Sequence, residues 1–267
     1  MNVIKKAKKS LGQNFLVDKN IINKIISVGD ISKNKTIMEI GPGYGSLTTS
    51  ILSLEPKKII AVEKDRELFS FLKEKFKNLK SVEILNRDIL DILNLEILEK
   101  NITVFGNLPY NISTKILASL ITLNQWPPWY ETLIFMFQKE VADRILAKTS
   151  SKEYGRLSVL ANWRLDIKKH FDVSFNCFYP KPKINSTVLS FRPKMVKYYI
   201  KNPKNLEMIT RVLFNNRRKM INKNFLKLFN NDQSVAKELQ LNLNLRPAEL
   251  SNEMFYKITM KYEKLFN

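Results

Sequence analysis

Strand-like runs alternate with helical patterns through the first 150 residues, and this alternation constrains the fold more than any other feature of the chain. Short apolar runs rich in isoleucine and valine predict strands, and the amphipathic segments between them predict helices. Such an alternation favours a parallel sheet with helices on both faces. The predicted strands are residues 35–41, 58–63, 82–85, 102–106 and 132–138, and the predicted helices are residues 45–54, 65–76, 113–123 and 139–147.

The pattern changes towards the C-terminus. Two further predicted strands, residues 168–175 and 186–192, have no helix between them, so we expect the sheet to close with an antiparallel hairpin. After Pro193 the periodicity is helical. The predicted helices there are residues 206–216, 218–229, 234–240 and 252–265. We therefore predict an α/β domain in residues 1–193 and a small all-α domain in residues 194–267.

The cysteine and histidine content excludes several kinds of site. A single cysteine, Cys177, cannot form an internal disulfide or a cysteine-based zinc site, and a single histidine, His170, excludes a histidine-rich metal site. We therefore expect no metal and a protein of the reducing cytoplasm. The apolar runs fall well short of the roughly 20 residues that a membrane-spanning helix needs, so no membrane partner is expected. Residues 1–10 contain four lysines but no apolar run after them, which is unlike a secretory signal.

The chain is strongly basic, with a formal net charge of +20. Half of this excess lies in residues 190–267, which hold 16 basic and 6 acidic side chains in under a third of the length. A nucleic-acid partner would account for the charge, because lysines that neutralise phosphates release condensed counterions. The chain is also rich in Lys, Asn and Ile together, a bias that an AT-rich genome produces without functional demand. Charge alone leaves both explanations open.

A glycine-rich loop with the sequence Glu-Ile-Gly-Pro-Gly-Tyr-Gly, residues 39–45, follows the first predicted strand. Glycines at this turn let the backbone approach a ligand closely. The dinucleotide pattern G-x-G-x-x-G would need a glycine at position 46, where the chain has Ser46, and Pro42 removes an amide that could face a pyrophosphate. The variant E-x-G-x-G-x-G, centred on Gly41 and Gly43, therefore favours a ligand without a pyrophosphate, such as S-adenosylmethionine.

Two acidic residues follow the next two predicted strands. Glu63 lies 22 residues after Gly41, where it could accept hydrogen bonds from ribose hydroxyls, and Asp88 could accept one from an adenine amino group. Each acid taken singly is typical of a solvated loop. Because the carboxyl ends of neighbouring parallel strands meet at one crevice, the loop and the two acids together predict an adenosine-shaped site.

The fourth predicted strand ends in the tetrapeptide Asn107-Leu108-Pro109-Tyr110. Polar groups at a strand end usually satisfy backbone donors or cap a helix, and Ser113 is a candidate cap. The proline makes the turn rigid and leaves the Leu108 carbonyl outside any helix. The Asn107 side-chain oxygen and the Leu108 carbonyl are then two adjacent acceptors that can grip an exocyclic amino group, and Tyr110 offers a ring face for a planar base.

These groups suit methylation of an adenine N6 amine. The lone pair of that nitrogen is delocalised into the ring, so the amine is a poor nucleophile. Two acceptors that bind its hydrogens favour a pyramidal nitrogen and direct the lone pair to a sulfonium methyl. In-line positioning supplies the rest of the effect, and no strong base is needed because the proton becomes acidic once the methyl has transferred. His170 and Cys177 are accordingly expected to have no catalytic role.

Four segments of the chain occur in a characteristic order: residues 9–16 (KSLGQNFL), the glycine loop, residues 107–113 (NLPYNIS) and residues 178–186 (FYPKPKINS). In these segments the chain resembles the KsgA family of small-subunit (16S) ribosomal RNA adenine N6,N6-dimethyltransferases. The resemblance covers essentially the whole chain, with one conservative departure at Ile184, where the family more often has valine. It implies a Rossmann-like S-adenosylmethionine-dependent methyltransferase domain, a basic cofactor and RNA segment at residues 1–17, and a helical C-terminal domain that binds RNA or the ribosome.

The resemblance also implies a substrate and roles for individual residues. Two adjacent adenosines in a hairpin loop near the 3′ end of 16S rRNA, within the 30S subunit or its precursor, would each be dimethylated by a monomeric enzyme. Phe178 would stack on the flipped adenine opposite Tyr110, although an aromatic core residue is the alternative. Three consecutive cations at a predicted helix start, Arg217, Arg218 and Lys219, would contact RNA phosphates, or form a solvated helix face. The expected cofactor-binding residues are Asn14, Leu16, Gly41, Gly43, Glu63, Asp88 and Asn107.

Two other functions compete with this hypothesis. A related large-subunit rRNA adenine methyltransferase of the macrolide-resistance type would use the same chemistry on another RNA, but residues 9–16 and 178–183 favour the small-subunit family. A non-enzymatic RNA-binding assembly factor would have no need of Glu63, Asp88 and an intact Asn-Leu-Pro-Tyr segment.

Overall fold

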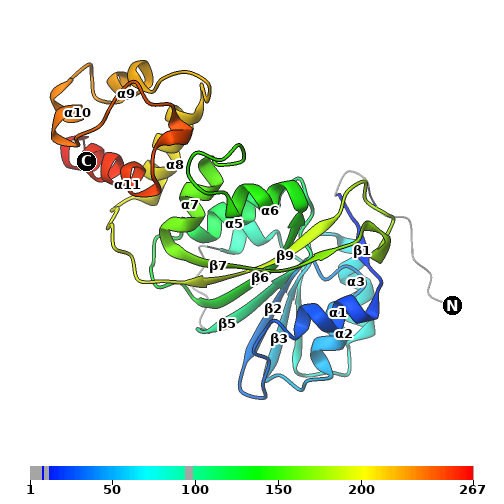
Figure 1. Cartoon of the computed structure of the whole chain (residues 1–267). Helices are drawn as coiled ribbons and strands as arrows, with labels where there is room; N and C mark the ends of the chain where they lie inside the picture. Colours follow the sequence, from blue (N-terminus) through cyan, green and yellow to red (C-terminus); the bar gives the residue numbers. More distant parts are fainter. Residues whose placement is uncertain (1–7, 9–11, 94–98, 267) are drawn as a thin grey trace. The chain divides into compact units, whose positions relative to one another are not determined.

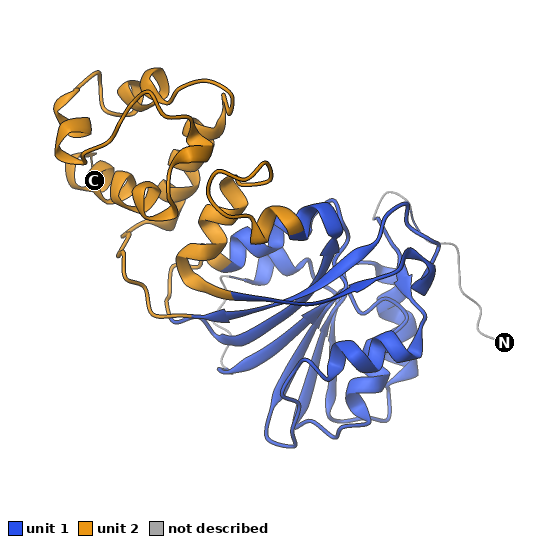
Figure 2. Cartoon of the chain, in the orientation of Figure 1, with its two compact units in different colours: residues 1–120, 127–142, 167–193 blue, residues 121–126, 143–166, 194–267 orange. Residues whose placement is uncertain are grey.

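The computed structural model describes Lys8 and residues 12–93 and 99–266, and these form two compact units (Figure 2). The first unit comprises residues 1–120, 127–142 and 167–193, and the second comprises residues 121–126, 143–166 and 194–267. The chain passes from one unit to the other after Pro193, at the predicted domain boundary. Residues 121–126 and 143–166 were expected in the first domain, however, and they belong to the second unit. Of the predicted basic segment 1–17, residues 1–7 and 9–11 lie outside the described residues.

A seven-stranded sheet forms the centre of the first unit, with the strand order β4-β3-β2-β5-β6-β9-β7 (Figure 1). The five strands from β4 to β6 run parallel to their neighbours, and β9 is antiparallel to β6. The strands are β2 (Thr36–Ile40), β3 (Lys58–Val62), β4 (Val82–Leu85), β5 (Ile102–Gly106), β6 (Tyr130–Gln138), β7 (Leu165–Val173) and β9 (Ser186–Pro193). The predicted α/β fold is thus confirmed, and β7 and β9 are neighbours at the edge, as expected.

Helices lie on both faces of this sheet (Figure 1). Three of them begin at an aspartate whose carboxylate accepts a hydrogen bond from a backbone amide of the first turn: Asp18 for α1, Asp65 for α3 and Asp88 for α4. Such caps satisfy amides that have no partner within the helix. The helices are α1 (Lys19–Ile26), α2 (Ser46–Leu52), α3 (Arg66–Lys75), α4 (Ile89–Ile92), α5 (Ser113–Ile121) and α6 (Lys139–Leu146).

The core of the first unit joins α1 and α2 to the sheet. Ile22, Ile25 and Ile26 of α1 belong to one buried cluster with Phe105 of β5 and Met136 of β6. Burying such a side chain stabilises the fold by about 1.5–3 kcal/mol. Helix α1 was not predicted, although the Asp18 cap and the isoleucine spacing are visible in the sequence. Ile25 of this helix also lines the cavity at the carboxyl ends of the strands.

A second, two-stranded sheet joins distant parts of the sequence. Strand β1 (Phe15–Leu16) pairs antiparallel with β8 (Phe178–Tyr179), which follows a short 3-10 helix at Phe175–Cys177. Phe15 lies opposite Tyr179, and Leu16 lies opposite Phe178. This pairing ties the N-terminal segment to the loop between β7 and β9.

The second unit is helical. Its helices are α7 (Arg156–Arg164), α8 (Pro203–Phe214), α9 (Asn222–Leu228), α10 (Ser234–Glu238) and α11 (Asn252–Phe266), with a 3-10 turn at Pro247–Glu249. The rings of Phe214 and Phe255 stack with centroids 5.2 Å apart. The buried carboxylate of Glu263 accepts the Lys201 and Asn202 amides, both at 2.8 Å, and so fixes the start of α8. The predicted helix 218–229 begins only at Asn222.

Candidate active site

A cavity of about 280 Å³ opens in the first unit where the strands β2, β3 and β5 end. The C-terminal ends of parallel strands are where α/β sheets bind ligands. Its wall is built from the N-terminal segment 12–16, the glycine loop and the residues that follow β3, β4 and β5, and the side chains of Ile134, Met136 and Val188 also line it. The structure therefore brings most of the predicted site residues together around one space.

The glycine loop gives this cavity an open backbone wall. Gly41 has a φ of +67°, a conformation that strains any other residue, and no atom lies within 4 Å of the place where its side chain would be. Gly43 has a φ of +60°, and a side chain there would lie 2.8 Å from the ring of Phe15. Gly41 is thus needed for the shape of the loop. Gly43 is needed for that shape and also for the packing of the loop against Phe15.

Glu63 is held in place by backbone amides. One carboxylate oxygen accepts the amide of Gly43 at 3.2 Å and the other accepts the amide of Asp65 at 2.9 Å. Burial raises the pKa of Glu63, and these two amides oppose that rise. A carboxylate has about four acceptor positions, so Glu63 can still accept a hydroxyl donor from a ligand beside these amides.

Asp88 combines a structural role with a place in the cavity wall. It caps α4 by accepting the Leu90 amide at 3.0 Å, and its other oxygen binds Lys64 Nζ at 2.7 Å. Partial burial would raise the pKa of Asp88, but the Lys64 and Leu90 bonds outweigh it and hold the pKa below its usual range. The carboxylate is therefore a fixed, ionised acceptor.

The tetrapeptide after β5 presents the Asn107 side-chain oxygen and the Leu108 carbonyl as acceptors. Asn107 Nδ2 donates to the Asn14 carbonyl at 2.9 Å, which leaves Oδ1 to accept from a ligand. The Pro109 carbonyl takes the amides of Ile112 and Ser113, while among the described residues the Leu108 carbonyl receives no hydrogen bond. The Ser113 hydroxyl donates to the Tyr110 carbonyl at 3.3 Å. Both acceptors belong to residues that line the cavity.

Tyr110 also lines the cavity, and its hydroxyl is paired. Its Oη lies 2.8 Å from the Ser186 hydroxyl, at the start of β9. Burial raises the pKa of Tyr110, and the Ser186 bond opposes that rise. The phenol therefore stays neutral beside the cavity.

Phe178 does not face Tyr110 across the cavity. Its side chain is 2% exposed and belongs to the same buried cluster as Leu16, Ile25 and Met136, all of which line the cavity. The pairing of β8 with β1 turns the ring into the core. The alternative of an aromatic core residue thus describes its position, behind the cavity wall.

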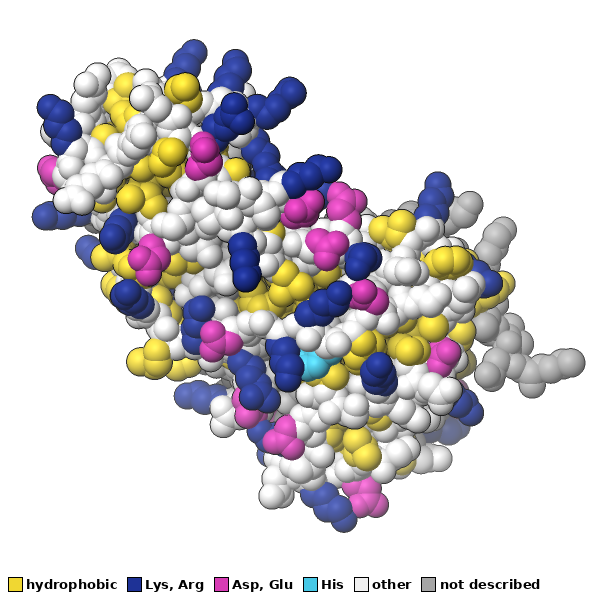
Figure 3. Space-filling view, viewed as in Figure 1, with side chains coloured by type: hydrophobic (Ala, Val, Ile, Leu, Met, Phe, Trp, Pro, Cys, Tyr) yellow, Lys and Arg dark blue, Asp and Glu magenta, His cyan; other side chains and the backbone are white. Residues whose placement is uncertain are grey.

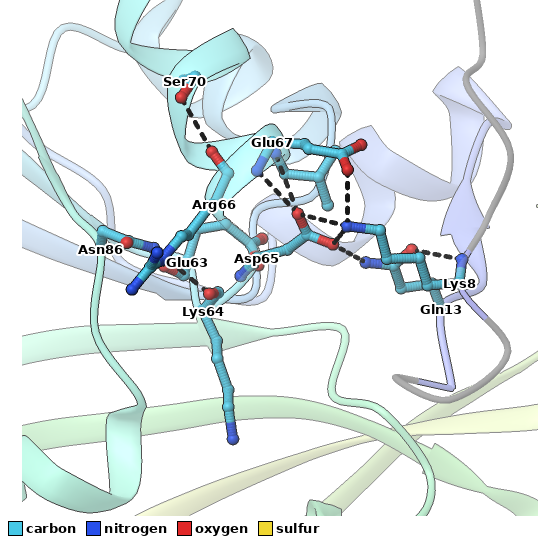
Figure 4. A network of polar contacts seen from close by, with 10 residues as sticks. Lys8, Gln13, Glu63, Lys64, Asp65, Arg66, Glu67, Ser70 and Asn86 are labelled. Atoms are coloured by element: carbon cyan, nitrogen blue, oxygen red, sulfur yellow. Dashed lines mark hydrogen bonds and ion pairs between the residues drawn. The ribbon is translucent and has the colours of Figure 1, made fainter.

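The sequence did not single out a network that anchors the N-terminal segment (Figure 4). Lys8 Nζ binds the carboxylates of Asp65 at 2.9 Å and Glu67 at 3.1 Å, and Gln13 Nε2 donates to Asp65 at 3.3 Å. Burial would raise the pKa of Asp65, but Lys8 and the α3 amides hold it below its usual value. Asn14 and Leu16 line the cavity from this anchored segment.

Glu39 is the other functional candidate that sequence reasoning left without a role. It lines the cavity, is 3% exposed, and accepts the Thr48 hydroxyl at 2.5 Å. Burial raises its pKa to about 7. The sequence feature that could have identified Glu39 is its place as the acidic first residue of the pattern E-x-G-x-G-x-G.

The three predicted RNA-contacting cations lie in a turn between α8 and α9, not at a helix start. Arg217 donates to the backbone carbonyls of Ser151 and Lys152 within the second unit. Arg218 and Lys219 are exposed. Arg217 is therefore engaged in the fold, and only the two that follow it project into solvent.

Residues 4–264 match the ribosomal RNA adenine dimethylase family. The chain belongs to this family. It is 48% identical to a ribosomal RNA small subunit methyltransferase A of Pelagibacter ubique, over 97% of this chain and 98% of the relative, and 39% identical to the protein of that name from a Wolbachia of Drosophila simulans, over 98% and 95%. Family membership confirms the predicted class, an S-adenosylmethionine-dependent rRNA adenine dimethyltransferase, and its cofactor.

Two solved structures share the fold. A dimethyladenosine transferase from Plasmodium falciparum has a TM-score of 0.74 and 24% identity, covering 94% of this chain and 98% of that one. The 23S rRNA methyltransferase ErmE has a TM-score of 0.65 and 20% identity, covering 93% and 99%. Neither identity decides the substrate. Within the described parts of the chain, no helix is long and apolar enough to span a membrane, and no three potential metal ligands cluster.

Proposed function

We propose that this enzyme transfers methyl groups from S-adenosylmethionine to the N6 amines of two adjacent adenosines in the 3′-terminal hairpin loop of 16S rRNA, and dimethylates each. The observation that carries the reaction is the pair of acceptors, Asn107 Oδ1 and the Leu108 carbonyl, at the wall of a cavity suited to adenosine. The names of the relatives at 48% and 39% identity support the small subunit as the substrate.

The cavity residues fit the cofactor by their chemistry. Glu63 would accept the ribose hydroxyls and Asp88 the adenine amino group, while the open backbone at Gly41 leaves room for the amino-acid part. When bound, the cofactor supplies an electrophilic methyl group on a sulfonium. The residues that we assign to its site are Asn14, Leu16, Gly41, Gly43, Glu63, Asp88 and Asn107.

The target base would be held beside this site. Asn107 Oδ1 and the Leu108 carbonyl would accept the two N6 hydrogens, and Tyr110 would stack on the ring. Extruding the base costs a few kcal/mol, and least in a single-stranded loop. Because Phe178 is buried, we assign the stacking to Tyr110, and Phe178 supports the wall behind Leu16.

The acceptors act by position. They hold the amine with its lone pair directed at the methyl group, and fixed placement of two reactants can supply several kcal/mol of the barrier. The N6 proton becomes acidic as the new bond forms, so it can leave to solvent without a dedicated base. No histidine or cysteine lines the cavity, in agreement with this route.

We further propose that the RNA is presented on the 30S subunit or its precursor, in the cytoplasm, to a monomeric enzyme with two domains. The first would carry the cofactor and target sites, and the helical second would contact RNA. The exposed Arg218 and Lys219 are suited to RNA phosphates, which fix register without reading sequence.

Complementation tests the substrate. In a bacterial strain that lacks the 16S dimethylation, expression of this chain should restore the primer-extension stop at the 3′-terminal loop. A stop that appears only on large-subunit RNA would replace this proposal with an activity of the ErmE type. RNA binding without any stop would support a non-enzymatic assembly factor.

A further inference from the structure

The hydroxyl of Tyr110 forms a hydrogen bond with a side chain to which the proposed reaction assigns no role. Its Oη lies 2.8 Å from Ser186 Oγ. Tyr110 follows β5, whereas Ser186 opens β9, and β6 lies between these two strands in the sheet. The Tyr110 side chain therefore extends past the end of β6 and binds β9, the second strand from β5 in the sheet.

Ser186 is a rigid anchor. It is fully buried and pairs with Gln138 in the antiparallel ladder of β6 and β9. The preceding Asn185 is also fixed, because its carbonyl accepts the Lys139 amide at 3.0 Å and its side-chain oxygen accepts the Phe175 amide at 3.1 Å. The backbone that carries the Ser186 hydroxyl is therefore held in a fixed place.

Tyr110 lacks comparable restraint of its own. Its backbone lies in a turn, held by the bonds of Ile112 and Ser113 to the Pro109 carbonyl, and these bonds do not involve the side chain. In the described parts of the chain, the bond to Ser186 is the one hydrogen bond of its side chain. Among the described residues, that bond is therefore the polar restraint on the orientation of the ring.

We propose that Ser186 is a positioning residue, which fixes the ring of Tyr110 in the orientation that stacks on the target base. This inference rests on the proposed function of Tyr110. Fixing the ring before the base arrives removes an orientational cost from the transfer step, since catalysis gains from groups held in place in advance. Ser186 acts only through the tyrosine hydroxyl and touches neither cofactor nor base.

A double-mutant cycle tests the assignment, with kcat and KM measured on whichever rRNA the wild-type enzyme methylates. We expect Ser186→Ala and Tyr110→Phe each to lower kcat about three- to tenfold, the size of effect of one neutral hydrogen bond, with little change in KM for S-adenosylmethionine. The double variant should lose no more than either single one, because both changes remove the same bond.

Ser190 provides a matched control on the same strand. Its hydroxyl makes a bond of equal length, 2.8 Å, to His170 Nε2, and neither residue lines the cavity. Ser190→Ala should leave kcat unchanged. Independent losses that multiply in the double variant, or an equal loss in Ser190→Ala, would overturn the assignment. A wild-type enzyme that methylates only large-subunit RNA would instead refute the proposed substrate and leave the cycle interpretable.

Discussion

At the scale of single residues, the site depends on an amide whose two ends have different roles. Asn107 donates through Nδ2 to the Asn14 carbonyl, and this bond directs Oδ1 to the ligand. If the Asn107 side chain only satisfied the backbone, there would be no reason for it to line the cavity beside a second acceptor, the Leu108 carbonyl. The N-terminal segment thereby orients the group that we assign to the amine.

Asn107→Ala should lower kcat by about 10²-fold, because the amine loses one of the acceptors that position it. RNA affinity should stay within about twofold, since this side chain makes one contact of many. Single-turnover kinetics and filter binding measure the two effects separately. The matched control is Asn34→Ala, at an exposed position outside the cavity. Parallel losses of turnover and RNA binding in Asn107→Ala would contradict the assigned role.

Glu39 gives a pH-dependent stability. Its folded-state pKa of about 7 lies above its ordinary value of 4.5, so its contribution to stability is fully present below pH 4.5 and is lost as the pH rises through 7. Glu39→Gln should therefore gain stability relative to wild type between pH 5 and pH 8, by at most about 3 kcal/mol. Urea unfolding of both proteins at the two pH values measures this difference, and a difference that stays constant with pH would refute it.

At the scale of elements, sequence pattern found the central strands because β2 and β5 are buried along their whole length, and such strands form continuous apolar runs. It missed α7, which is buried on several sides and so has little amphipathic character. It left the burial of Phe178 open, because that burial depends on pairing with Leu16 some 160 residues away. Local periodicity carries no information on such a long-range contact.

The anchor of the N-terminal segment can be separated from helix capping. Asparagine caps a helix about as well as aspartate, so Asp65→Asn should keep α3 stable while it loses the charge that binds Lys8. We expect both Asp65→Asn and Lys8→Met to raise the Kd for S-adenosylmethionine several-fold at low salt, and less at high salt, because ion pairs are screened. Calorimetric titration at two salt concentrations measures this. A Kd that Lys8→Met leaves unchanged would show that the anchor is not needed.

At the scale of the whole molecule, ribosomal RNA is a polyanionic substrate that would account for the net charge of +20. The basic side chains are nonetheless spread over both units. Lys and Arg side chains project from both units on the face in Figure 3. Several basic side chains of the chain are ion-paired on the surface, such as Lys33 with Glu55 and Lys77 with Glu74. We therefore expect charge to bring the enzyme to RNA and the cavity to select the atom that is methylated.

Substitutions in the turn after α8 test whether its cations bind RNA without taking part in the reaction. Replacing both Arg218 and Lys219 by alanine should lower the slope of log K against log salt for RNA binding by about 2, with kcat unchanged. Arg217→Ala should instead destabilise the second unit, because it removes bonds to two carbonyls. The control is the pair Lys33→Ala and Lys77→Ala, which should leave the slope nearly unchanged. A slope that Arg218 and Lys219 do not affect would remove this turn from the RNA interface.

The most direct measurement is the transfer of labelled methyl groups from S-adenosylmethionine to unmethylated 30S particles, followed by mass spectrometry of the 16S fragments. The proposed function predicts two adjacent N6,N6-dimethyladenosines in the 3′-terminal loop with the wild-type enzyme and a strongly reduced yield with Asn107→Ala. Methyl groups at another position or on another atom, or equal yields from both proteins, would contradict it.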